Sequence, residues 1–219
     1  MNAASNLDRQ TSLQEFMQKK FIIELKKGVA SMHQFVHPTV LQSAAIPVIK
    51  KSDSKNIIVR YSELSGIKLT LLLPLVNQQI QHVIKQFQGD EKQPLTYSLF
   101  LCHTNQRCSA MAEFARELTK FAQDVVDIVT FDQLDFQDIK HDWSQRTKKP
   151  DEEKLEEDEK VKAQIKSSNK VLFVTPSTAQ TMFGKGILST KNAKCFGLVV
   201  DKINMHQAFD LDQDLIELS

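Results

Sequence analysis

The stretch Val171-Leu172-Phe173-Val174-Thr175 is a nearly continuous apolar run of strand-forming residues. Similar runs occur at residues 56–59, 97–102, 125–131 and 196–201. Because their apolar residues do not alternate with polar ones, such runs are typical of parallel strands buried on both faces. Residues 71–87, 109–121 and 179–185 have the three- or four-residue apolar spacing of crossover helices. The sequence therefore predicts an α/β fold with a doubly wound, mainly parallel sheet.

The N-terminal part of the chain has helical spacing. Residues 13–30 and 39–46 each predict a helix. The break between them falls at His37-Pro38, because the residue before a proline is disfavoured in the α region. We expect residues 1–36 to form a helical cap and residues 37–219 to form one domain. Inside that domain, residues 144–168 are densely charged, which predicts a solvated helix or a disordered insertion.

The composition excludes several classes of protein. Lys and Arg number 28 against 27 for Asp and Glu, so the formal net charge is +1 and any contact with RNA must be local. The three cysteines, Cys102, Cys108 and Cys195, are odd in number and lack C-x-x-C spacing, which argues against a disulfide framework and against a metal site. No apolar stretch is long enough to cross a membrane. We expect a soluble, intracellular protein without membrane affinity or DNA specificity.

The segment His37-Pro38-Thr39-Val40-Leu41-Gln42-Ser43-Ala44-Ala45-Ile46-Pro47 closely resembles the Q motif of DEAD-box RNA helicases. Further along, Val174-Thr175-Pro176-Ser177 resembles the T-P-G-R region of that family, and Val199-Val200-Asp201-Lys202 lies where V-D-E-A-D belongs. The resemblance implies the first RecA-like domain, a P-loop NTPase fold, with a sheet truncated before the strand of motif III. The segment after Asp201 is similar to the nucleolar subgroup that acts in ribosome assembly, which implies a nuclear or nucleolar location.

The resemblance also implies positions that bind a nucleotide. In the family, the Q-motif glutamine reads the adenine edge and an upstream aromatic residue stacks on the base; Gln42 and Phe16 occupy these places. The match to the Walker A loop retains Ser65 and Gly66 but places an isoleucine at the phosphate-binding lysine, and a shift of one residue would make Lys68 that lysine. ATP and Mg²⁺ are therefore cofactors by resemblance alone.

The catalytic motif is altered as well. Asp201 stands where the family has its Mg²⁺-binding aspartate, but Lys202 replaces the glutamate that positions the attacking water. General acid–base groups of this kind contribute about 10²–10⁴ in rate. We therefore predict that Asp201 is the one catalytic position retained, and that the chain does not hydrolyse ATP or unwind RNA on its own.

Two loops that contact RNA in the family are partly retained. In the first loop the family's threonine is kept as Thr104, its arginine is replaced by Asn105, and another arginine, Arg107, follows two residues later. In the second loop, hydroxyl groups and the backbone N–H groups that open the next helix could hold a phosphate. The RNA-binding residues implied in this way are Thr104, Asn105, Arg107, Thr175, Pro176 and Ser177.

Three functions stay open. We prefer an inactive helicase-like module that binds RNA or a ribonucleoprotein. The second is part of a functional ATP-dependent RNA helicase whose second domain is absent from this chain; S-A-T and R-G-x-D segments downstream in the gene would support it. The third is an assembly scaffold without RNA or ATP binding, which a lack of RNA affinity at low salt would favour. A sheet that lacks the motif III strand would have an exposed edge, which predicts a protein partner that covers it.

Overall fold

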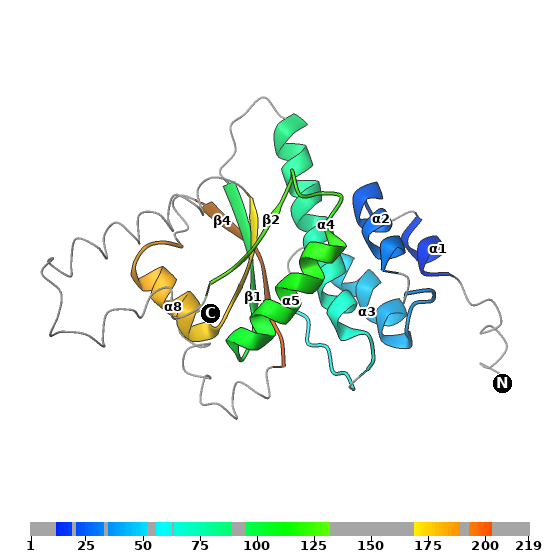
Figure 1. Cartoon of the computed structure of the whole chain (residues 1–219), viewed down its shortest axis with the longest axis horizontal. Helices are drawn as coiled ribbons and strands as arrows, with labels where there is room; N and C mark the ends of the chain where they lie inside the picture. The colour runs from blue at the N-terminus through cyan, green and yellow to red at the C-terminus, as the bar shows by residue number, and fades with distance from the viewer. Residues whose placement is uncertain are drawn as a thin grey trace, which may run out of the picture. The chain divides into compact units, whose positions relative to one another are not determined.

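A computed structural model describes residues 12–18, 21–32, 35–51, 56–62, 64–88, 95–131, 169–188 and 193–202 of the chain (Figure 1). Two compact units can be distinguished. Unit 1 contains the described residues up to Gln81 together with Phe114–Gln123, and unit 2 contains His82–Glu113 and the described residues from Asp124 onward. The division between the units runs through helix α4 (Ile67–Gln88) and helix α5 (Asn105–Leu118).

Unit 1 is helical, as the sequence predicts for its N-terminal part. It contains α1 (Leu13–Gln18), α2 (Ile23–Ser31), α3 (Val40–Lys51) and the first part of α4. The expectation of one helical stretch over residues 13–30 is corrected, because Ile22 is extended (φ −63°, ψ 154°). The Ile22 N–H donates to Oδ1 of Asn77 at 3.1 Å instead of continuing a helix. The chain therefore ends α1 early and begins α2 as a separate helix.

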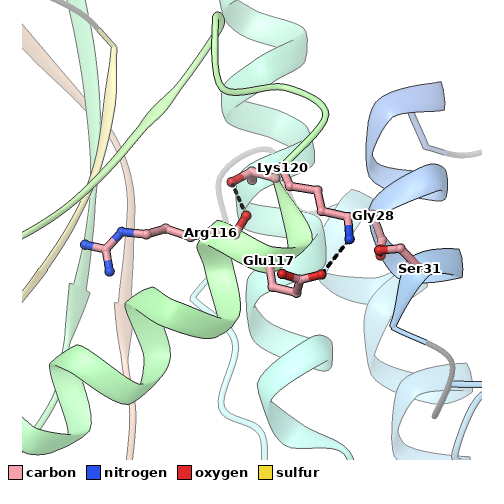
Figure 2. A network of polar contacts seen from close by, with 6 residues as sticks. Gly28, Ser31, Arg116, Glu117 and Lys120 are labelled. Atoms are coloured by element: carbon pink, nitrogen blue, oxygen red, sulfur yellow. Dashed lines mark hydrogen bonds and ion pairs between the residues drawn. The ribbon is translucent and has the colours of Figure 1, made fainter.

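Helix α2 packs closely on the end of α5 within unit 1. A Cβ atom placed on Gly28 would clash with the carbonyl oxygen of Leu118, so only glycine permits this approach. Figure 2 shows the polar contacts beside this crossing: Ser31 Oγ donates to the carbonyl of Gly28 at 2.7 Å, and Lys120 Nζ pairs with Glu117 Oε1 at 2.7 Å. The Lys120–Glu117 pair is solvent-exposed and contributes little, since such pairs are screened by water.

Unit 2 contains a four-stranded sheet in the order β2-β3-β1-β4. The strands are β1 (Leu95–Leu101), β2 (Asp127–Thr130), β3 (Lys170–Val174) and β4 (Ala193–Val200). All pairings among these strands are parallel, with Leu101 opposite both Val174 and Val200. Helix α8 (Pro176–Gly184) begins directly after β3, and α5 begins shortly after β1. This arrangement confirms the predicted α/β class and the parallel sheet.

Both faces of the sheet are apolar, which explains why its strands show no alternation. On one face, side chains of β1 and β3 pack with those of α8, and the buried cluster includes Tyr97, Leu99, Leu101, Leu172, Val174, Ala179 and Met182. The opposite face carries Phe100 and Phe173, whose rings stack with 5.1 Å between their centroids. Figure 1 shows α8 on one side of this sheet. Four of the five predicted strands are thus confirmed, with ends that shift by one to three residues.

The strand predicted at residues 56–59 is wrong. Residues 56–60 have no strand pairing, and the Ile58 side chain is 94% exposed. Strand-forming side chains express a fit to a pleated surface rather than an intrinsic backbone preference, so β-branched residues without a hydrogen-bonded neighbour do not form a strand. The run of isoleucine and valine indicated a strand from composition, but it carried no information about a pairing partner.

Two further expectations concern the charged insertion and membrane-spanning helices. The charged insertion predicted at residues 144–168 lies outside the described residues. In the part of the chain that the structure describes, no helix combines the length and apolarity needed to cross a membrane.

Candidate functional site

In unit 1, the glutamine of the Q-like segment is bound to the loop that precedes α4. Gln42 lies on α3 and is 1% exposed. Its Oε1 accepts a hydrogen bond from the N–H of Thr39 at 2.9 Å, and its Nε2 donates to the carbonyl of Gly66 at 3.2 Å. The Thr39 hydroxyl donates to the carbonyl of Ser65 at 2.7 Å. Two side chains of this segment therefore hold two consecutive carbonyls of the loop.

The loop itself has an unusual backbone. Leu64 (φ 65°) and Gly66 (φ 81°) both lie in the left-handed region, which costs a residue with a side chain about 1–2 kcal/mol. A Cβ atom on Gly66 would clash with the Gln42 amide and would lie 3.1 Å from Cγ2 of Thr39. Leu64 bears this conformation with its side chain fully exposed. The loop shape thus depends on glycine at position 66.

The residues at this loop do not fit the phosphates of a nucleotide. A phosphate-binding loop needs a lysine that reaches the β- and γ-phosphates. Ile67 is the first residue of α4, and the Lys68 ammonium lies 5.8 Å from the centroid of the Phe114 ring, so it is engaged by an aromatic face. The Gln42 amide is occupied by backbone groups at both of its ends. The loop therefore lacks the lysine that a phosphate-binding loop uses.

Phe16, the second residue expected at adenine, lies half-buried on α1, a different helix of unit 1 from the one that carries Gln42. The Ser65 hydroxyl is buried, and among the described residues it has no hydrogen-bond partner. The structure thus brings Gln42, Ser65 and Gly66 together in one loop contact.

In unit 2, the loop that contains Thr104 leads into helix α5; it is the first of the two loops that the family resemblance implies for RNA contact. Thr104 precedes the helix, and its Oγ1 accepts from the Arg107 N–H at 3.2 Å, as an N-cap residue does. Asn105 is the first residue of α5 and is half-buried. The retained threonine therefore caps its own helix.

The second of these loops contains Thr175 and leads into helix α8, which is capped in the same manner. The Thr175 hydroxyl accepts from the Thr178 N–H at 3.3 Å and is hydrogen-bonded to the Thr178 hydroxyl at 2.9 Å. Pro176 is buried in the first turn, where its missing N–H has no cost, and the Ser177 hydroxyl lies 3.3 Å from that of Thr175. Because β1 and β3 are neighbouring parallel strands, both helices begin at the same edge of the sheet.

Arg107 and Asp201 form an ion pair at that edge. Arg107 Nε lies 2.7 Å from Asp201 Oδ2. The Asp201 side chain has no solvent exposure and that of Arg107 is 19% exposed. The Asp201 N–H donates to the carbonyl of Leu101, which continues the β4–β1 pairing by one residue. The structure thus brings together an arginine expected at RNA and an aspartate expected at Mg²⁺.

This carboxylate does not fit a divalent metal ion, because a guanidinium already neutralises it at hydrogen-bond distance. Within the described residues, no group of three or more His, Cys, Asp or Glu side chains could hold a metal ion. Lys202, which replaces the family's glutamate, has a left-handed backbone (φ 53°) and turns the chain directly after Asp201.

Two thiols lie beside the ion pair. A hydrogen bond to the Cys108 side chain, together with burial, raises the pKa of the Cys102 thiol well above its ordinary value. The Asp201 carboxylate raises this pKa further, whereas Arg107 lowers it. Both cysteines are buried and free, and a thiol held in its protonated form is a poor nucleophile. They are packing residues of this unit.

Sequence reasoning missed both main contacts of these sites. It predicted neither the hydrogen bond between the Gln42 amide and the Gly66 carbonyl nor the ion pair between Arg107 and Asp201, which it treated as members of separate sites. The pairing had a partial signal, since runs 97–102 and 196–201 were both predicted as parallel strands whose carboxyl ends share one edge. The order of the strands, which makes β1 and β4 neighbours, was not predicted.

Neither a protein-family profile nor a curated protein sequence matches the chain. Solved structures do match it. The S. cerevisiae protein Dbp5 bound to RNA and ADP BeF3 superposes with a TM-score of 0.62 at 17% identity, over 93% of this chain and 42% of Dbp5. The RNA helicase Prp28 from Chaetomium thermophilum bound to ADP gives 0.60 at 17% identity, over 90% and 40%.

A DEAD box protein from the hyperthermophile Methanococcus jannaschii gives a TM-score of 0.61 at 15% identity, over 91% of this chain and 44% of that protein. The chain therefore has the RecA-like α/β fold that these DEAD-box proteins contain. It spans about two fifths of the length of these proteins.

Proposed function

We propose that this chain is a helicase-like module that binds RNA or a ribonucleoprotein and does not turn over ATP. The observation that carries the proposal is the shared position of two capped helix starts, those of α5 and α8, at one edge of the sheet. Helix N-termini offer backbone N–H groups and a positive dipole end to phosphates. The similar yeast protein Dbp5 was solved bound to RNA, which supports the same ligand class here.

The proposed loss of ATP turnover rests on three altered positions. The carboxylate of Asp201 is neutralised by Arg107, Lys202 stands at the position of the water-positioning glutamate, and Ile67 stands at that of the phosphate-binding lysine. Because the net charge is only +1, RNA affinity must come from local contacts at the starts of α5 and α8. This affinity should fall steeply as salt is added. The proposal includes no bound cofactor.

A charge inserted at Ser177 separates RNA binding from folding. Ser177 lies in the first turn of α8, where a carboxylate suits the helix dipole but repels a phosphate. We expect Ser177→Asp to leave the melting temperature unchanged or higher while RNA affinity falls by about tenfold, equivalent to about 1.4 kcal/mol. Fluorescence anisotropy with a labelled single-stranded RNA measures this change.

The matched control is Ser43→Asp, the same change at an exposed position of α3 in the first turn and a half of that helix. We expect this variant to bind RNA as the unmodified chain does. Equal loss of affinity in both variants would indicate a general charge effect and would remove the assignment of RNA to the α8 start.

The second candidate is part of a functional ATP-dependent RNA helicase. The fold likeness favours it, because Prp28 from Chaetomium thermophilum, which superposes on this chain, is an RNA helicase. RNA-stimulated ATP hydrolysis by this chain joined to a second RecA-like domain would support it and would overturn the proposal of an inactive module. A role in ribosome assembly with a nuclear or nucleolar location rests on the sequence resemblance, and a fluorescent fusion that stays outside the nucleolus would count against it.

The third candidate is a scaffold that binds an extended apolar strand of another protein. Strand β4 favours it: among the described strands it pairs on one side only, it is eight residues long, and its Leu198 side chain is 49% exposed. The other edge strand, β2, is four residues long and begins with Asp127, a charge that discourages pairing. Lack of RNA affinity at low salt, combined with a partner complex that Leu198→Lys disrupts, would favour this function over the first.

A further inference from the structure

Helix α3 has apolar side chains on both of its sides. Its inner side buries Ile46 together with the amide of Gln42. On its outer side, Val40, Ala44 and Val48 recur every four residues and are exposed, so they form one stripe along the helix. The exposed fraction is 86% for Val40 and 56% for Val48. Only four of the twelve residues of α3 are polar, a composition typical of a helix that is covered on every side.

A further exposed apolar side chain lies at the start of this stripe. The Thr39 hydroxyl, directly before α3, donates to the carbonyl of Ser65 at 2.7 Å. Their neighbours in the chain, Val40 and Leu64, therefore lie at the same end of the helix, and both are exposed. Leu64 has a left-handed backbone (φ 65°), and strained residues of this kind cluster where ligands bind. The four exposed side chains of this region, here called the α3 surface, are Val40, Ala44, Val48 and Leu64.

The charges beside the α3 surface are positive. Lys50 and Lys51 lie in the last turn of α3, and this helix contains no acidic residue. Lys51 is exposed, whereas the Nζ atom of Lys50 lies 4.8 Å from the centroid of the Phe21 ring. Among the described residues of unit 1, eight are Lys or Arg and three are Asp or Glu, although the net charge of the whole chain is only +1. A partner of complementary charge is therefore acidic.

We propose that the α3 surface docks an acidic amphipathic helix of a partner protein. The apolar stripe of such a helix packs on Val40, Ala44 and Val48, because ridges of side chains four residues apart fit the grooves of a facing helix. Acidic side chains beside that stripe face Lys51, which orients the partner along α3. Single-stranded RNA fits this surface poorly, because bases stack on aromatic side chains and the α3 surface has only aliphatic ones.

The probe for this surface is a fluorescently labelled synthetic peptide of leucine, alanine and glutamate, in which the leucines recur every three or four residues. A peptide with the same residues in scrambled order is its control. Fluorescence anisotropy at low salt should give saturable binding of the amphipathic peptide, with a dissociation constant of roughly 10–100 µM. The scrambled peptide should bind at least about tenfold more weakly, since it cannot present one apolar stripe.

Two substitutions locate the binding on α3. Val48→Glu places a carboxylate within the stripe and should weaken peptide binding by about tenfold or more, because like charges repel and apolar contact is lost. Lys51→Glu reverses the charge beside the stripe and should weaken binding by about three- to tenfold. Both positions are exposed, so the melting temperature should change by less than about 2 °C.

The matched control is Lys85→Glu. Lys85 is also an exposed lysine in the last turn of a helix, but this helix end, that of α4, belongs to unit 2. The variant changes the net charge and the interaction with the helix dipole as Lys51→Glu does, and it should bind the peptide as the unmodified chain does. Ser177→Asp, the variant that tests RNA binding, should also bind the peptide normally, so the two proposals can fail separately.

Four results would overturn the inference. Equal binding of the two peptides, or no saturable binding of either, would mean that the stripe does not dock a helix. Equal weakening by Lys51→Glu and Lys85→Glu would indicate a general charge effect. Displacement of the peptide by single-stranded RNA would make RNA the occupant of the α3 surface. Self-association in sedimentation experiments that Val48→Glu abolishes would make a second copy of this chain the occupant.

Discussion

The Nε2 atom of Gln42 donates a hydrogen bond to the carbonyl oxygen of Gly66, with 3.2 Å between the two atoms. Thr70 Oγ1 donates to the same carbonyl at 3.0 Å. The loop before α4 is thereby bound from α3 and from the first turn of α4. In this chain the glutamine of the Q-like segment fixes a backbone turn.

Gly66→Ala should destabilise the folded chain. The alanine would have to adopt a left-handed backbone conformation, and its methyl group would clash with the Gln42 amide. We expect a loss of about 2 kcal/mol or more in the free energy of unfolding, measured by urea denaturation. Gly184→Ala is the matched control, since nothing lies within 4 Å of its Cβ position at the end of α8. That variant should gain about 0.5–1 kcal/mol, and an equal loss in both would contradict the strained loop.

Gln42→Ala should lower stability without changing the response to nucleotide. The variant removes two hydrogen bonds from a buried position, for an expected loss of about 1–3 kcal/mol in the free energy of unfolding. Gln78→Ala, which removes one long hydrogen bond to the Lys50 carbonyl at 3.4 Å, should lose less than about 1 kcal/mol. Calorimetry should give no ADP binding for any of the three proteins. Tight ADP binding that disappears in Gln42→Ala would return this residue to adenine recognition.

Tyr97 should make the fold sensitive to alkaline pH. Burial, with a smaller contribution from Cys195, raises its pKa from 10.0 to about 12. The folded state then holds a proton that the unfolded state releases, so stability is complete below pH 10 and is lost as pH rises toward 12. Tyr97→Phe should remove part of the fall in unfolding free energy over that range, by about 1–3 kcal/mol. An identical alkaline profile in the two proteins would refute this role.

The same variant has a second expected effect at neutral pH. The Tyr97 hydroxyl is buried and has no hydrogen-bond partner among the described residues. Replacing it with phenylalanine should therefore leave stability at pH 7 unchanged or raise it by up to about 1 kcal/mol. Urea denaturation at both pH values measures the two effects on one protein.

Much of the fold could be predicted from the sequence because its signals are local. The continuous apolar runs at β1 and β3 reflect burial on both faces of the sheet, and His37-Pro38 limits the helix that follows. The segment at residues 56–59 is also rich in strand-forming residues but forms no strand, because strand formation needs a partner that composition does not specify. Local pattern thus predicts a secondary structure only where the tertiary pairing agrees.

The site was less predictable because its contacts are long-range. Arg107 and Asp201 are 94 positions apart in the chain, and their meeting depends on β1 and β4 being neighbours. Gln42 and Gly66 are 24 positions apart, and their contact depends on the backbone path of one loop. A motif match assigns a residue to a family role, whereas these contacts depend on the tertiary structure around the motif.

The most direct test of the proposed function is RNA affinity measured by fluorescence anisotropy at low salt, without nucleotide and with ATP plus Mg²⁺. The account predicts binding that weakens steeply with added salt and is the same with and without nucleotide. Binding that requires ATP and Mg²⁺ would contradict it, because the nucleotide site would then be functional. Absence of RNA binding under both conditions, with the protein folded, would also contradict it and would leave the scaffold function.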